Sequence, residues 1–66
     1  MKVKVNRKTV EIFDGAKTRQ ALLRYFTIRK MDLKLVEQLE VYDAYGHLIG
    51  LDAPLSDGQA IKFKQP

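Results

Sequence analysis

The sequence predicts an α+β domain in which a sheet packs on one main helix. Residues 1–5, 9–13 and 60–64 alternate apolar and polar side chains, the period of two that a half-buried strand shows. Residues 18–26 instead carry apolar side chains at the spacing of one helical face. Strands at both ends of the chain with a helix between them indicate one helix layer on one sheet layer.

The first two strand segments form a predicted hairpin with Asn6 in its turn. In residues 1–5 the valines share one face, and Lys2 and Lys4 share the other. Residues 9–13 resume the alternation. The inward candidates of the two segments are Val3, Val5, Val10 and Ile12.

The helix is expected to start two or three residues after Asp14-Gly15, a pair that ends the second strand. Phe13, which breaks the alternation, is expected to cap the end of the core. Thr18 is either the N-cap or the first core-facing residue, and the apolar stripe favours the core role. The stripe consists of Thr18, Ala21, Leu22, Tyr25 and Phe26.

After the helix, residues 28–31 read as a loop, followed by a second short helix of about two turns with Asp32 near its start. Met31, Leu35, Val36 and Leu39 would share one face of that helix. Residues 41–49 then predict a second hairpin, with Asp43 and Gly46 in its turn.

The last strand, residues 60–64, follows a loop rich in turn residues at 50–59. Ile61 and Phe63 face one way, and Lys62 and Lys64 face the other.

Composition narrows the function classes. The chain has 66 residues, expected to form one domain over residues 1–66, and a chain of this size has little room for a sheltered catalytic cavity. It has no cysteine, which excludes thiolate-held clusters and cysteine zinc sites. Its one histidine, His47, lacks a second ligand nearby and is interpreted as a surface hairpin residue. We therefore expect no enzyme activity, no cofactor and no metal site.

Charge and hydropathy bear on partners and location. No apolar run approaches the ~18 residues that span a bilayer, so a soluble, cytoplasmic protein without membrane contact is expected. Twelve Lys and Arg against eight Asp and Glu give a net charge of +4. This excess favours an acidic protein or a nucleic acid as partner, although the same charge is ordinary for the solubility of a small domain.

Three stretches carry a family resemblance that covers nearly the whole chain. They are Val5-Asn6-x-Lys8-x-Val10, Gly15-Ala16 with Ala21-Leu22-Leu23, and Pro54-Leu55-Ser56-Asp57-Gly58-Gln59-x-Ile61. With this order of elements, the chain resembles the ubiquitin-like sulfur-carrier proteins of thiamine and molybdopterin synthesis and the related TGS domains. The resemblance implies a β-grasp fold, with a mixed sheet of four to five strands on the helix.

Two departures from the family pattern stand out. Lys17 replaces a common threonine, which predicts that helix capping is shifted or lost. The chain ends in Lys64-Gln65-Pro66, whereas the carriers end in Gly-Gly, whose terminal carboxylate becomes a thiocarboxylate. The chain as given is therefore not expected to carry sulfur, and a carrier whose Gly-Gly tail is absent from this chain is one alternative.

In a β-grasp fold the first and last strands lie side by side and parallel in the middle of the sheet. Lys2, Lys4, Lys62 and Lys64 would then gather on the open face as a basic stripe, with Arg7 or Lys8 at its rim. The resulting hypothesis is an interaction module that binds a protein through this face. A TGS-like RNA-binding domain is the other alternative, in which Tyr42 or Tyr45 would supply an aromatic.

Overall fold

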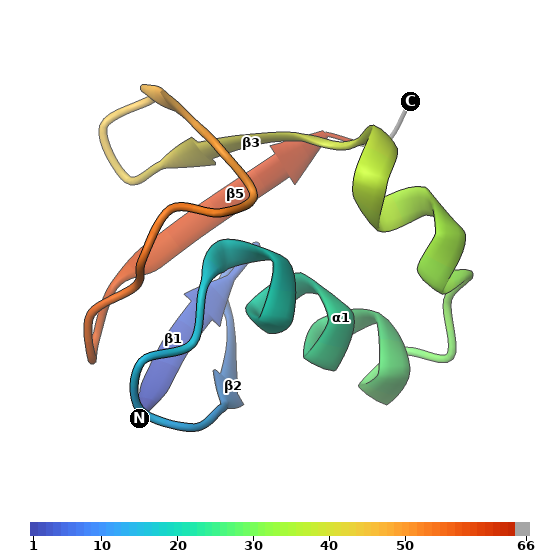
Figure 1. Cartoon of the computed structure of the whole chain (residues 1–66), viewed down its shortest axis with the longest axis horizontal. Coiled ribbons are helices and arrows are strands. Elements are labelled where there is room, and N and C mark those ends of the chain that lie inside the picture. The colour runs from blue at the N-terminus through green and yellow to red at the C-terminus, as the bar shows by residue number, and fades with distance from the viewer. Residues whose placement is uncertain (65–66) are drawn as a thin grey trace.

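The computed structural model describes residues 1–64 and shows an α+β arrangement of a five-stranded mixed sheet, one α-helix and one 3-10 helix (Figure 1). The elements are β1 (Lys2–Val5), β2 (Lys8–Glu11), α1 (Thr18–Ile28), η1 (Leu33–Gln38), β3 (Glu40–Asp43), β4 (Leu48–Ile49) and β5 (Ala60–Lys64). The strand order is β2-β1-β5-β3-β4. The predicted α+β class, with a sheet and one main helix, is confirmed.

The first hairpin turns tightly at Asn6 and Arg7. Both residues have positive φ, 50° and 72°, and Val5 pairs directly with Lys8 on either side of them. Two left-handed residues in a two-residue turn match the right-handed twist of the strands. Asparagine tolerates this conformation, whereas arginine adopts it at a cost.

β1 and β5 are joined as parallel neighbours at the centre of the sheet. Lys4 pairs with Ala60, and the backbone N–H of Lys4 donates to the carbonyl of Gln59 at 2.9 Å. Asn6 continues the junction, because its N–H donates to the carbonyl of Ile61 at 3.0 Å and its Oδ1 accepts from the N–H of Phe63 at 3.0 Å. The two halves of the chain therefore meet along this pair, the arrangement that the family resemblance implies.

Helix α1 covers one face of the sheet and supplies the largest share of the core (Figure 1). Its predicted stripe is confirmed: Thr18, Ala21, Leu22, Tyr25 and Phe26 are all buried. From the sheet they meet Val3, Val5, Val10, Val41, Ile61 and Phe63, which are also buried. The rings of Phe26 and Phe63 lie 5.5 Å apart between their centroids.

The start of α1 settles the role of Thr18. Lys17 is the N-cap, and Thr18 is the first helical residue, fully buried, with its Oγ1 donating to the carbonyl of Ala53 at 3.1 Å. A lysine side chain has no acceptor for the free N–H groups of the first turn. Gln20 supplies the remaining half of the cap, because its Oε1 accepts from the N–H of Lys17 at 2.6 Å.

Of two further local predictions, one was confirmed and one was wrong. The second short helix is present over Leu33–Gln38, as a 3-10 helix with Asp32 at its N-cap. Val36 and Leu39 are buried, whereas Met31 and Leu35 are only partly buried. Phe13 does not cap the core, since 61% of its surface is exposed.

We predict that Asn6→Gly lowers the free energy of unfolding by about 1–3 kcal/mol, because it leaves the part-buried N–H of Phe63 without its acceptor. Asn6→Ala should cost roughly 1 kcal/mol more, since alanine is strained at positive φ. Urea denaturation measures both. Arg7→Gly is the matched control and should be neutral or stabilising; an Asn6→Gly protein as stable as the parent would contradict the role of the hydrogen bond.

Candidate functional site

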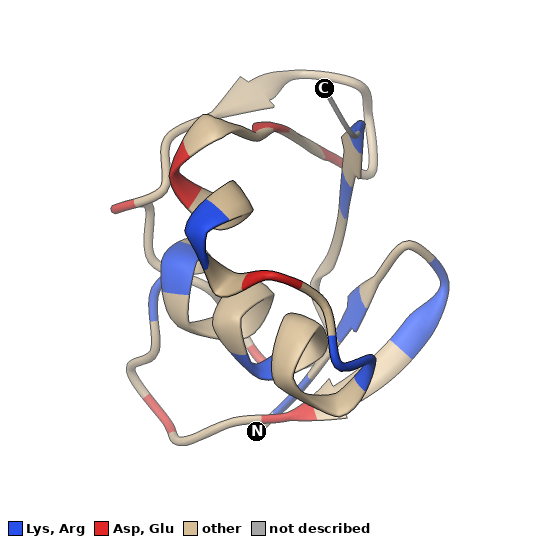
Figure 2. Ribbon diagram, turned by 90° about the vertical axis from the view of Figure 1, so that its right-hand side faces the viewer, with Lys and Arg blue, Asp and Glu red and all other residues tan. Residues whose placement is uncertain are grey.

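The face of the sheet opposite α1 carries the predicted lysines. Strand alternation turns the valines of β1 and the apolar residues of β5 toward the helix, and the lysines between them point to solvent. Lys2, Lys4, Lys62 and Lys64 are all exposed. We call these four residues the lysine line. Figure 2 shows the corresponding basic segments on β1 and on β5.

The register arranges the lysines in a row along the strands. Lys4 is level with Ala60, so Lys62 lies two residues further along the sheet than Lys4. At about 3.3 Å per residue, the line from Lys2 to Lys64 extends roughly 20 Å. No two of the four lysines are direct cross-strand partners, an arrangement that limits their mutual repulsion.

Carboxylates flank the two ends of the lysine line. Glu11 is the cross-strand partner of Lys2, and Glu40 is the partner of Lys64. Opposite charges at directly paired positions attract each other across a sheet. The positive charge is thus least compensated at the centre of the line, at Lys4 and Lys62.

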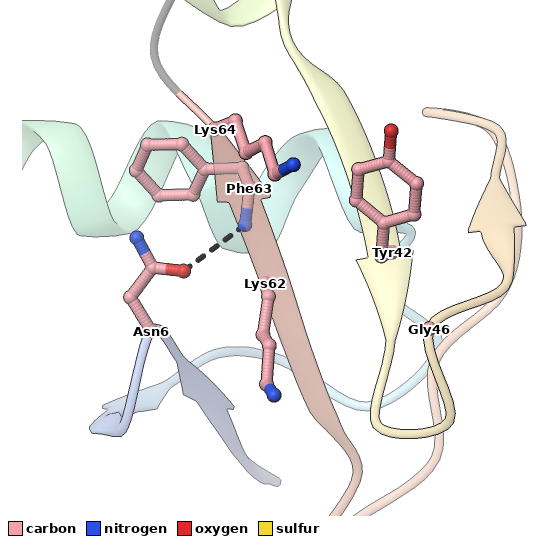
Figure 3. Close-up of a pocket in the computed structure, with 6 residues that line it drawn as sticks. All are labelled: Asn6, Tyr42, Gly46, Lys62, Phe63 and Lys64. Carbon is pink, nitrogen blue, oxygen red and sulfur yellow. Dashed lines mark hydrogen bonds between the residues drawn. The ribbon is translucent and has the colours of Figure 1, made fainter.

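A shallow hollow of about 490 Å³ opens beside the second half of the line. Its lining residues are Asn6, Tyr42, Gly46, Lys62, Phe63 and Lys64 (Figure 3). Figure 3 shows Lys62 and Lys64 on β5, between Asn6 at the end of β1 and Tyr42 on β3. Arg7 lines an adjoining hollow together with Asn6 and Lys62, so the structure brings this predicted residue to the line.

The hydroxyl of Tyr42 donates to Glu40 Oε2 at 2.7 Å. This hydrogen bond to a carboxylate raises the pKa of Tyr42 above its ordinary value, because the bond holds the phenol in its protonated form. Tyr42 is also the cross-strand partner of Lys62. One aromatic ring therefore lies next to the centre of the lysine line.

Tyr45 is placed away from that hollow. It is 85% exposed in the turn between β3 and β4 and lines a different hollow, beside Gly58–Ala60. The turn is held by Asp43, whose Oδ1 accepts from the N–H groups of Tyr45 and His47 at 2.9 Å each. The hydrogen bond from the backbone N–H of His47 is the main interaction that lowers the pKa of Asp43 below its ordinary value. His47 itself is exposed, as predicted for a surface hairpin residue.

Arg19, on α1, forms ion pairs with two carboxylates of the same domain. Its Nε lies 2.7 Å from Glu37 Oε2, and its Nη1 lies 2.5 Å from Asp52 Oδ1. These bonds, that to Glu37 first, raise the pKa of Arg19 above its ordinary value. The pairs tie α1 to η1 and to the loop before β5, so we assign Arg19 a structural role.

Alternation placed Glu11 on the outward side of its strand, but the sequence did not identify Glu11, Glu40 or Leu48 as residues beside the lysine line. Glu11 and Glu40 become neighbours of the lysines only through the register. Leu48 is 67% exposed and is the cross-strand partner of Tyr42, which gives the face an apolar edge. As an apolar residue in a predicted strand, Leu48 would be expected in the core, but its pairing with Tyr42 places it on the open face.

Among residues 1–64, no group of three or more His, Cys, Asp or Glu side chains is arranged to hold a metal ion. Within the same range, no helix has the length and apolar character needed to cross a membrane. Comparison with models of protein families, with curated proteins and with solved structures found no match.

We predict that Glu40→Gln lowers the pKa of Tyr42 toward its ordinary value, because a neutral amide is a weaker acceptor than a carboxylate. Since the pKa of Tyr42 is raised on folding, the stability that this bond contributes is complete below about pH 10 and is lost as the pH rises through the raised value. An NMR titration of the tyrosine rings measures the shift. Glu11→Gln, on the other side of the face, should leave Tyr42 unchanged; an equal shift in both variants would refute the assignment.

Proposed function

We propose that this chain is a non-enzymatic interaction module of the β-grasp type, related to the sulfur carriers, and that it binds an acidic surface of a protein partner through its open sheet face. The observation that carries the proposal is the lysine line, which crosses the face that α1 leaves uncovered. The strand order, with β1 and β5 parallel at the centre, agrees with the fold that the sequence resemblance implies.

The pattern of charge on the face favours a protein over a nucleic acid. Carboxylates stand at both ends of the lysine line, where a continuous phosphate backbone would meet repulsion. A folded partner can instead present acidic residues to the centre of the line and basic residues to its ends, which gives electrostatic complementarity. The apolar edge at Leu48 adds contact area of a kind that protein interfaces use.

The open face offers limited aromatic surface on which nucleic-acid bases could stack. Single-stranded nucleic-acid sites combine cations with aromatic rings on which successive bases stack. Tyr42 is the ring beside the lysine line, and its hydroxyl is held by Glu40. RNA binding is therefore kept as an outcome of the test. The sulfur-carrier alternative concerns the tail at Gln65 and Pro66, which lies outside the described residues.

We predict that the double substitution Lys4→Glu with Lys62→Glu abolishes partner capture, because it reverses the charge at the least compensated part of the line. The measurement is affinity capture from a lysate of the source cells, with nuclease-treated and untreated samples compared. A protein that is retained after nuclease treatment by the parent chain, and lost with the double variant, is the expected result.

The matched control is Lys30→Glu with Lys34→Glu, which makes the same change of charge at exposed positions in the turn after α1 and in η1. This control should capture as the parent does. Capture that is equal for both double variants would overturn the proposal. Material that disappears on nuclease treatment, with affinity falling steeply as salt rises, would promote the RNA-binding alternative.

A further inference from the structure

Strand β2 forms one edge of the sheet, and its free backbone groups can be identified. The N-terminal amine of Met1 donates to the carbonyl of Ile12 at 2.6 Å, and the N–H of Ile12 donates to the carbonyl of Met1 at 2.9 Å. Antiparallel pairs alternate between bonded and non-bonded partners, so Thr9 and Glu11 fall at the non-bonded positions. Their N–H and C=O groups therefore point away from β1, toward the free edge.

The opposite side of β1 gives an independent check. The backbone groups of Lys2 and Lys4, which face Thr9 and Glu11 across the hairpin, bond toward β5 and its preceding loop instead. The N–H of Gly58 donates to the carbonyl of Lys2 at 2.7 Å, and the N–H of Lys4 donates to the carbonyl of Gln59 at 2.9 Å. Within residues 1–64, β2 thus presents an unpaired, solvent-exposed row of donors and acceptors, the template on which another strand can pair.

The charges along this edge reverse from one end to the other. Arg7 and Lys8 stand at its start, and Glu11 and Asp14 stand at its end, all of them exposed. When two copies of such an edge run antiparallel, the basic end of each lies beside the acidic end of the other. Edge strands that resist pairing place like charges in opposition, whereas this edge is complementary to itself.

A groove beside the same edge offers apolar surface. It has a volume of about 380 Å³ and lies between β2 and α1, lined by Glu11, Ile12, Phe13, Gln20, Leu23, Arg24 and Thr27. Phe13, which the core does not cover, contributes to it. Lys8 belongs to the helix-facing side of the sheet, because its partner Val5 does. The aliphatic part of Lys8 from another copy can therefore lie along this groove.

We infer that the chain forms a two-fold homodimer in which the β2 edges of two copies pair antiparallel, with Thr9 of each copy opposite Glu11 of the other. In this register each Thr9–Glu11 pair exchanges both hydrogen bonds, and every side chain keeps its side of the sheet. A shift of this register by two residues toward the hairpin turn would require an extended backbone at Arg7. The φ of Arg7 is 72°, which is not extended. A shift the other way would place Glu11 opposite Glu11.

The dimer joins the two five-stranded sheets edge to edge. Because the two-fold axis is perpendicular to the sheet, both α1 helices lie on one side and both lysine lines lie on the other. The interface uses backbone groups and the β2–α1 groove, not the lysine line. The inference therefore stands or falls separately from the proposed partner binding.

Sedimentation velocity over a range of concentrations tests the dimer by comparing the parent chain with the variant Thr9→Pro. Proline removes the outward N–H of residue 9, and since this group does not bond to β1, an edge position tolerates the change. The parent should approach twice the monomer mass as concentration rises, and Thr9→Pro should stay monomeric. Thr9→Val, which keeps the N–H and the branched side chain, is the matched control and should dimerise. A circular dichroism spectrum like that of the parent verifies that Thr9→Pro is folded.

Glu11→Lys is a second variant that leaves the backbone intact. It reverses the charge at the acidic end of β2 and should raise the dimer dissociation constant about tenfold at low salt, with the difference shrinking as salt screens the charges. A parent that remains monomeric at millimolar concentration would overturn the inference. So would a folded Thr9→Pro that dimerises as the parent does, or a Glu11→Lys with unchanged affinity.

Discussion

The parallel pairing of β1 with β5 is the constraint on which the rest of this structure depends. Without it the sheet would divide into the β1–β2 hairpin and the three-stranded unit β5-β3-β4, and a lone two-stranded hairpin is marginally stable in water. The pairing brings residues 4–6 beside residues 59–63, and Asn6 closes it with both its backbone and its side chain. Only then do the apolar residues of both parts of the sheet form one surface for α1 to cover.

The same pairing creates the open face. Alternation decides that the lysines of β1 and β5 turn away from the helix, but the register decides where each lies relative to the others. An offset of two residues draws the four lysines into a line and keeps them out of direct opposition. Placing β1 and β5 at the centre also leaves β2 at the edge, with one side of its backbone unpaired.

Local periodicity explains why much of this architecture was predictable. The helical stripe from Thr18 to Phe26 and the alternation in β1 and β5 are properties of short segments, and both were confirmed. Register is different, because it is set by the pairing between strands and not by the period of any one strand. The positions of Glu11, Glu40 and Leu48 relative to the lysine line were missed for this reason, since each depends on a cross-strand partner.

Local chemistry also explains the second short helix and the one wrong local prediction. The short helix before β3 begins where the sequence placed Asp32, because the Asp32 side chain accepts from the N–H of Lys34 at 3.0 Å. Phe13 was expected to cap the core, but burial alternates from Val10 to Phe13, so Ile12 takes the buried side and Phe13 takes the exposed side. The side chain of Phe13 contributes to the groove between β2 and α1.

In a domain with one helix on one sheet, the core lies between one face of the sheet and one face of the helix. The large surfaces that remain are the uncovered face and the sheet edges, and here they differ in chemistry. The face offers charged side chains, whose attraction acts at a distance and weakens with salt. The β2 edge offers backbone hydrogen bonds, which need contact and a defined register. Because the two surfaces rest on different interactions, self-association through the edge leaves the lysine line free, and a dimer would present two such lines on one side to a partner with two acidic patches.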